Sequence, residues 1–135
     1  MDEILAFLLN RASFLYKELG FRFVDSRYST SFGGDSLLVL TNDKIRFRIV
    51  RDRSQLFGDF QSAAPMPKDK WFSIDVVRHR LTGESECPSE LDNENMTFLR
   101  NQIGEIEKLF VEFNLASTCN ELRKLEAERA KKLFG

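Results

Sequence analysis

Residues Ser36–Phe60 read SLLVLTNDKIRFRIVRDRSQLFGDF, and this stretch decides the fold because three short hydrophobic runs in it are separated by turns. The clearest run is Lys44–Val50, where cationic and apolar side chains alternate: Lys44, Ile45, Arg46, Phe47, Arg48, Ile49. Successive side chains of a β-strand point to opposite faces of the sheet. The alternation therefore predicts a strand with one buried face and one solvated, cationic face.

Four strands are predicted in all, at Phe21–Thr30, Ser36–Leu40, Lys44–Val50 and Gln55–Phe60. The turns between them are rich in residues that favour tight turns: Gly33-Gly34-Asp35, Thr41-Asn42-Asp43 and Arg51-Asp52-Arg53-Ser54. Because connections this short favour antiparallel neighbours, we expect a meander in which each strand pairs with the next. After the last strand, Ala63–Pro67 contains two prolines and is predicted to be a loop.

Helices are predicted on both sides of the strands. Asp2–Leu19 carries apolar residues at spacings of three and four and ends before Gly20, a typical helix stop. The apolar stripe consists of Ile4, Leu5, Leu8, Leu9, Ala12, Leu15 and Leu19. The segment Trp71–Leu81 shows both a strand-like and a helix-like spacing. Ser73 as N-cap and Gly83 after the last turn favour a helix there.

Two further helices are predicted towards the C-terminus. One begins at the capping-box-like pair Ser89 and Asp92 and runs to about Asn114. Its apolar seam consists of Met96, Leu99, Ile103, Ile106, Phe110 and Phe113. Gly104 lies inside this helix, where we expect it to allow the close approach of a neighbouring element. The other helix begins at Thr118, and its charged body is expected to be solvated.

Together these patterns predict an α+β fold, with one antiparallel sheet of about four strands and helices packed on one face. The N-terminal helix and the C-terminal helices supply that layer. The 135 residues suit a single domain, residues 1–135, in which residues 118–135 form a charged and peripheral terminal helix. The chain has thirteen phenylalanines but two tyrosines, which indicates a core built largely from aromatic rings without polar groups.

Composition narrows the classes of function. The net charge is −1, which disfavours non-specific nucleic-acid binding by the whole surface but leaves room for a local basic patch. Cys87 and Cys119 lack the spacing of a metal site and are expected to be free thiols in a reducing compartment. No apolar run approaches the roughly 20 residues of a membrane span. We therefore expect a cytoplasmic protein without a membrane partner.

The first candidate site is a set of arginines on the predicted strands and in the turn after the third strand: Arg22, Arg46, Arg48, Arg51 and Arg53. Guanidinium groups bind carboxylates and phosphates through paired hydrogen bonds. In one interpretation these residues form a docking surface for an acidic partner or a phosphate backbone. In the other, the surface is only a solvated sheet face on which nearby aspartates neutralise the arginines: Asp25, Asp43, Asp52 and Asp59.

A second candidate site is acidic and contains Glu84, Glu86 and Glu90, with Asp92 and Glu94 close by in the sequence. These carboxylates either meet a basic partner surface or belong to a solvated loop and helix start. Trp71 also has two interpretations. We favour a buried position in the core; the alternative is a partly exposed anchor, a residue type that often dominates binding interfaces.

No catalytic or metal-binding signature is recognised. His79 is the only histidine, and no cysteine or carboxylate stands at the spacing that a zinc site requires. Asp52 at a strand end is more typical of turn hydrogen bonding than of catalysis. Gly33-Gly34 lacks the following lysine of a phosphate-binding loop. We therefore expect no enzyme activity, cofactor or metal.

Two segments resemble a known class of protein. The segment Ile45–Phe60 reads IRFRIVRDRSQLFGDF and is similar to a strand and its following turn in some immunity proteins of bacterial polymorphic toxin systems. The segment Trp71–Gly83 reads WFSIDVVRHRLTG and is similar to the next segment of those proteins, in which a tryptophan precedes a helix. The chain departs from that pattern at Ser54, where glycine is expected, and at Leu56, where an aromatic residue is common. The resemblance implies stoichiometric binding and blocking of a toxin, without catalysis.

The resulting hypothesis is a non-catalytic, cytoplasmic protein-binding protein, an immunity protein that neutralises a cognate toxin domain. We expect it to be a monomer or a homodimer, with a protein rather than a nucleic acid as its partner. The alternative is a nucleic-acid or phosphate-binding module that uses the arginine-rich sheet face. A third hypothesis, a small hydrolase or transferase, would have to use His79 or Asp52.

Overall fold

A computed structural model describes residues 1–28, 36–63 and 70–134 of the chain. Five strands form one antiparallel sheet in the order β1-β2-β3-β4-β5. Their bounds are Arg22–Tyr28 (β1), Ser36–Thr41 (β2), Ile45–Asp52 (β3), Gln55–Ser62 (β4) and Phe72–Ser73 (β5). The helices are Asp2–Asn10 (α1), Phe14–Lys17 (α2), Ile74–Thr82 (α3), Asn93–Phe110 (α4) and Glu112–Phe134 (α5). The predicted α+β meander is confirmed, with the short β5 as an additional strand.

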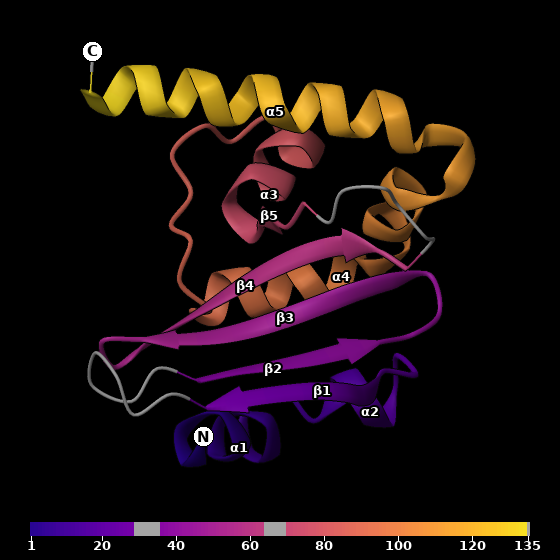
Figure 1. Ribbon diagram of the computed structural model, residues 1–135, viewed down its shortest axis with the longest axis vertical. Helices are drawn as coiled ribbons and strands as arrows, with labels where there is room; N and C mark the ends of the chain where they lie inside the picture. The colour runs from indigo at the N-terminus through magenta and orange to yellow at the C-terminus, as the bar shows by residue number, and fades with distance from the viewer. Residues whose placement is uncertain (29–35, 64–69, 135) are drawn as a thin grey trace.

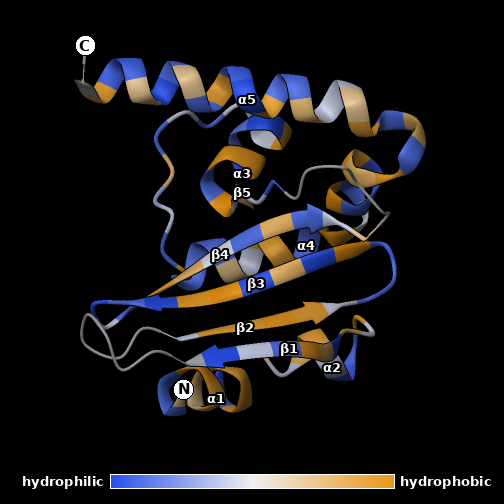
Figure 2. Ribbon diagram, viewed as in Figure 1, coloured by the Kyte–Doolittle hydropathy of each residue, from blue (hydrophilic) through white to orange (hydrophobic). Residues whose placement is uncertain are grey.

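One face of the sheet packs against helices. In Figure 1, α1 and α4 lie behind the sheet, and the described residues place no helix in front of it. The alternation predicted for the third strand is confirmed because Ile45, Phe47 and Ile49 are completely buried. The rings of Phe47 and Phe60 pack against each other with centroids 4.9 Å apart. Hydrophobic residues dominate β2, whereas hydrophilic residues recur along the whole length of α5 (Figure 2).

The prediction of one continuous helix over Asp2–Leu19 is wrong. The chain leaves α1 at Arg11 and starts the four-residue α2 at Phe14. The break is stabilised by contacts distant in sequence, since Arg11 Nη2 donates to Asn93 Oδ1 at 2.6 Å. The break also changes which side chains of the helix are buried. Phe7, which is not in the predicted apolar stripe, is buried, whereas Leu9 of that stripe is 70% exposed. Gly20 has a φ of +73°, a value that favours glycine, but α2 ends before it at Lys17 and not at the predicted Leu19.

The C-terminal helix boundaries also differ from the prediction. The N-cap of α4 is Asp92, whose Oδ1 accepts a hydrogen bond from the backbone N–H of Asn95 at 2.8 Å, and Ser89 lies before the helix. The fresh helix begins at Glu112 rather than at Thr118, which is buried inside α5. Two expectations about the seam fail. Phe113 is 97% exposed, and a Cβ at Gly104 would have no neighbouring atom within 4 Å.

The segment Trp71–Leu81 combines both of its predicted interpretations. Phe72 and Ser73 pair with β4 as the edge strand β5, and the helix α3 begins directly afterwards at Ile74. This helix ends at Gly83 with φ +81°, as predicted. The predicted hairpin turn at residues 33–35, the end of the first predicted strand at 29–30 and the proline-containing loop at 64–67 lie outside the described residues.

Candidate functional site

The helix-free face of the sheet carries Arg46 and Arg48 of β3, two residues apart on the same face. The strand register places Arg46 opposite Gln61 and Arg48 opposite Asp59 of β4. Arg46 Nη1 donates to Gln61 Oε1 at 2.9 Å. Arg48 donates to Asp59 Oδ2 through Nε at 3.0 Å and through Nη2 at 2.7 Å. The two guanidinium groups are thus held by neighbours on β4, but only Arg48 pairs with a carboxylate.

Trp71 lies across these two arginines. The guanidinium carbon of Arg48 is 4.5 Å from the indole ring centroid, and that of Arg46 is 5.4 Å away. These distances are typical of cation–π contacts, in which the ring face attracts the positive charge. Trp71 is half-buried on this surface and is not part of the hydrophobic core. The core position favoured from the sequence is therefore wrong, and the structure contains the partly exposed position.

A hollow of about 180 Å³ adjoins the three residues. Its lining consists of Asp25, Arg27, Leu37, Val39, Arg46, Arg48 and Trp71, which we call the arginine–tryptophan surface. The register explains why they meet: Asp25 pairs with Val39, and Val39 pairs with Arg48. Arg27 Nε lies 3.7 Å from Asp25 Oδ2. The hollow therefore gathers three guanidinium groups and one carboxylate on the sheet face that no helix of the described residues covers.

The other predicted arginines do not join this surface. Arg22 pairs with Asp43 at 2.6 Å, and this contact lowers the pKa of the Asp43 carboxyl from its ordinary value. Arg51 continues the buried side of β3 and reaches Glu3 of α1 at 2.5 Å. Arg53 lies exposed at the β3–β4 turn without a partner in the described part of the chain. Of the five predicted arginines, Arg46 and Arg48 therefore lie together on this surface, and the other three lie outside it.

The carboxylates of the predicted acidic site mostly form contacts with other residues of the same chain. Glu84 pairs with Arg78 at 2.8 Å, and Glu86 pairs with Lys132 at 3.1 Å. Glu90 is exposed and forms a backbone bridge with Phe57 of β4. The first two carboxylates therefore balance cations of the same chain.

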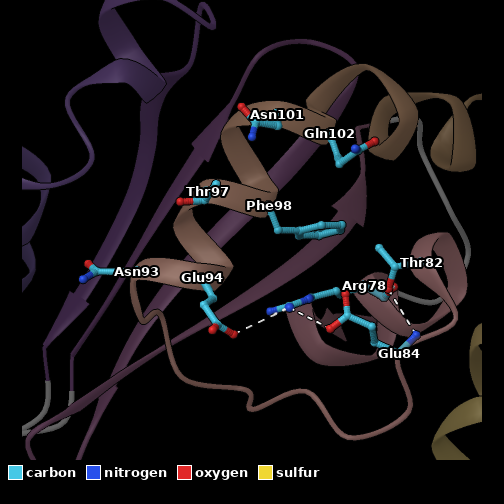
Figure 3. A pocket seen from close by; sticks show the side chains of 9 residues that line it. All are labelled: Arg78, Thr82, Glu84, Asn93, Glu94, Thr97, Phe98, Asn101 and Gln102. Carbon is cyan, nitrogen blue, oxygen red and sulfur yellow. Dashed lines mark hydrogen bonds and ion pairs between the residues drawn. The ribbon is translucent and has the colours of Figure 1, made fainter.

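A second hollow, of about 400 Å³, lies between α3 and α4. Figure 3 shows Glu94, Phe98 and Gln102 on one side of α4, with Arg78 and Thr82 of α3 opposite them. The guanidinium of Arg78 already donates to Asn95 Oδ1 at 3.0 Å and lies 3.7 Å from Glu94 Oε2, in addition to its contact with Glu84. Because acceptors of the same chain already surround the guanidinium of Arg78, we assign the hollow between α3 and α4 a structural role.

The residues considered for catalysis lie on separate elements. Asp52 is exposed at the end of β3, and His79 lies in the last turn of α3, where its Nδ1 is buried without a hydrogen-bond partner. Within the described ranges, no group of three or more His, Cys, Asp or Glu side chains could hold a metal ion. None of the helices in these ranges is long and apolar enough to cross a membrane.

Three residues of the arginine–tryptophan surface were not found by sequence reasoning, namely Arg27, Leu37 and Val39, whereas Asp25 is one of the aspartates expected near the arginines. Their signal is the strand register, which joins positions far apart in the sequence. Gln61 was missed for the same reason, whereas the expected neutralisation by Asp59 is found at Arg48. Comparison with known proteins adds no assignment: no protein-family model, curated protein or solved structure matches the chain.

Proposed function

We propose that this chain is a non-catalytic protein-binding protein, an immunity protein that binds and neutralises a bacterial toxin domain. The supporting observation is the half-buried Trp71 held across Arg46 and Arg48 on a sheet face that no described helix covers. Tryptophan and arginine are the residue types most enriched among the dominant contacts of protein interfaces. Their packing against each other reduces the side-chain freedom that remains to be lost on binding.

The charge distribution favours a protein partner over a nucleic acid. A nucleic-acid backbone is bound by a continuous series of cations that are free to replace its counterions. Arg22, Arg48 and Arg51 are each paired with a carboxylate of this chain. The cationic surface is therefore short and interrupted, which suits a few contacts to a folded protein. We place this activity in the cytoplasm, with the chain acting as a monomer or a homodimer.

The proposal is tested by measuring binding to the product of the neighbouring gene by isothermal titration calorimetry. We expect a one-to-one complex, and Trp71→Ala should weaken it by at least about tenfold, as expected for a dominant interface residue. Arg53→Gln is the matched control because Arg53 is exposed and distant from the hollow in the β3–β4 turn. The proposal fails if no association is found at micromolar concentrations. Binding of duplex DNA that falls steeply with salt would favour the alternative function.

A further inference from the structure

We propose that the hollow on the arginine–tryptophan surface is a binding site for one carboxylate, an aspartate or glutamate side chain of the protein partner. This inference rests on the proposed function, because it specifies what part of a partner the surface recognises. Its starting point is an imbalance of charge. Arg27, Arg46 and Arg48 surround the hollow, whereas two carboxylates, Asp25 and Asp59, lie beside them.

Of the three guanidinium groups at the hollow, that of Arg46 has no carboxylate partner among the described residues. Arg48 is bound twice by Asp59, and Arg27 lies near Asp25. Arg46 instead donates one N–H to the neutral amide oxygen of Gln61. A guanidinium carries several N–H donors in a rigid planar fork, so most of the donors of Arg46 remain for an incoming acceptor. The group that best complements such a fork is a carboxylate.

The surroundings hold Arg46 in place for this purpose. Gln61 is almost completely buried and fixes one Nη atom, while the Trp71 ring lies 5.4 Å from the guanidinium carbon. A pre-positioned side chain loses less conformational freedom on binding than a mobile surface arginine. Leu37 and Val39 line the same hollow. Their apolar atoms lower the local exposure to water and so strengthen a charged hydrogen bond formed there.

One carboxylate fits the hollow better than a run of phosphates. The volume of about 180 Å³ matches a short side chain rather than a stretch of nucleic-acid backbone. Counting described residues alone, the local excess is a single positive charge, and Asp25 at the same hollow repels any extended polyanion. The preferred ligand is therefore an isolated acidic side chain presented by a folded surface or a peptide.

The fluorescence of Trp71 reports on this site directly, because it is the only tryptophan of the chain. The probe is the blocked peptide acetyl-Gly-Gly-Glu-Gly-Gly-amide, and its counterpart with glutamine is the matched control. We expect a saturable change with the glutamate peptide and an affinity at least about tenfold lower for the glutamine peptide, because only the former carries the charge. Equal responses to both peptides, or no saturable change up to about 50 mM, would overturn the inference.

Variants separate the role of Arg46 from that of its neighbours. Arg46→Gln should weaken glutamate-peptide binding at least about tenfold, and Arg46→Lys should weaken it less because the charge remains without the fork. Arg53→Gln should leave the affinity within about twofold of the unchanged chain, since an exposed cation outside the hollow contributes little. Thermal unfolding of each variant shows whether it is folded. A folded Arg46→Gln variant with unchanged affinity contradicts the inference, as does tighter binding of inorganic phosphate than of the glutamate peptide.

The same variants distinguish this inference from the proposed function. If the product of the neighbouring gene binds the unchanged chain and Arg46→Gln equally well, the carboxylate site is wrong and the protein-binding function stands. If the glutamate peptide binds through Arg46 but the partner does not associate, the site stands and the choice of partner is wrong.

Discussion

Gly58 of β4 lies directly against the ring of Phe47 of β3. A Cβ atom added at Gly58 would come within 2.8 Å of two ring carbons of Phe47 and equally close to Leu91. Both neighbours are almost completely buried, so neither can move away without disturbing the core. Glycine is required here because of packing, since the backbone of Gly58 is not in the left-handed region.

We predict that Gly58→Ala lowers the free energy of unfolding by about 1–3 kcal/mol, the usual effect of overpacking a core. Gly104→Ala is the matched control, because the added Cβ meets no atom within 4 Å. That change should raise stability by up to about 1 kcal/mol, since alanine favours a helix over glycine. Urea denaturation of both variants measures the two effects. Equal stability of the two variants would show that the close packing around Gly58 has been misjudged.

The β3–β4 turn contains two non-glycine residues with positive φ, Arg53 at 51° and Ser54 at 71°. A two-residue hairpin turn of this geometry favours glycine at its second position. We therefore predict that Ser54→Gly raises the free energy of unfolding by about 1 kcal/mol, because the strain of a left-handed side chain is relieved. Ser54→Ala retains the Cβ atom and serves as the control, which should not gain stability. Thermal and urea unfolding measure both changes.

Glu121 of α5 provides a test of pH dependence. Its hydrogen bond from Arg80 lowers the pKa of the Glu121 carboxyl from the ordinary value of 4.5. A carboxyl with a lowered pKa in the folded state stabilises the fold above its unfolded pKa, and this contribution is lost as the pH falls through the folded pKa. We expect Glu121→Gln to lose a small part of the stability at pH 7, and the difference from the unchanged chain should vanish in acid. Because the pair is well exposed, the effect should be below about 1 kcal/mol.

Urea unfolding at several pH values from neutral to well below 4.5 checks this prediction, since the contribution begins to be lost as the pH falls below the ordinary pKa of the carboxyl. A difference between the two proteins that grows on acidification would have the wrong sign and would reject the assignment.

The two cysteines should be unreactive in the folded protein. Cys87 and Cys119 are free and buried, and burial is the main cause that raises the pKa of each thiol from 9.0. The thiolate is the reactive form, so both its abundance and its access are reduced near neutral pH. We predict that native thiols react with Ellman's reagent at least about tenfold more slowly than glutathione does. In denaturant both should react fast, and rapid labelling of the native chain would argue against the buried positions.

A feature of this fold could be predicted from the sequence when residues close together in the chain determine it. The strand Lys44–Val50 was predicted because a period of two is a local property of neighbouring side chains. The helix end at Gly83 was predicted for a similar reason, since a positive φ is strongly favoured for glycine alone. These signals also sufficed for the α+β class and for the cationic side of the third strand.

Only the tertiary structure decided which cations share a surface. Arg51 pairs with Glu3 and Arg11 with Asn93, partners that are 48 and 82 residues away in the chain. Trp71 lies over Arg46 and Arg48 because antiparallel pairing carries β5 back along β4, which is a consequence of register and not of local pattern. Local periodicity reports which side of an element is buried, whereas the identity of the neighbouring side chain depends on how distant segments pack.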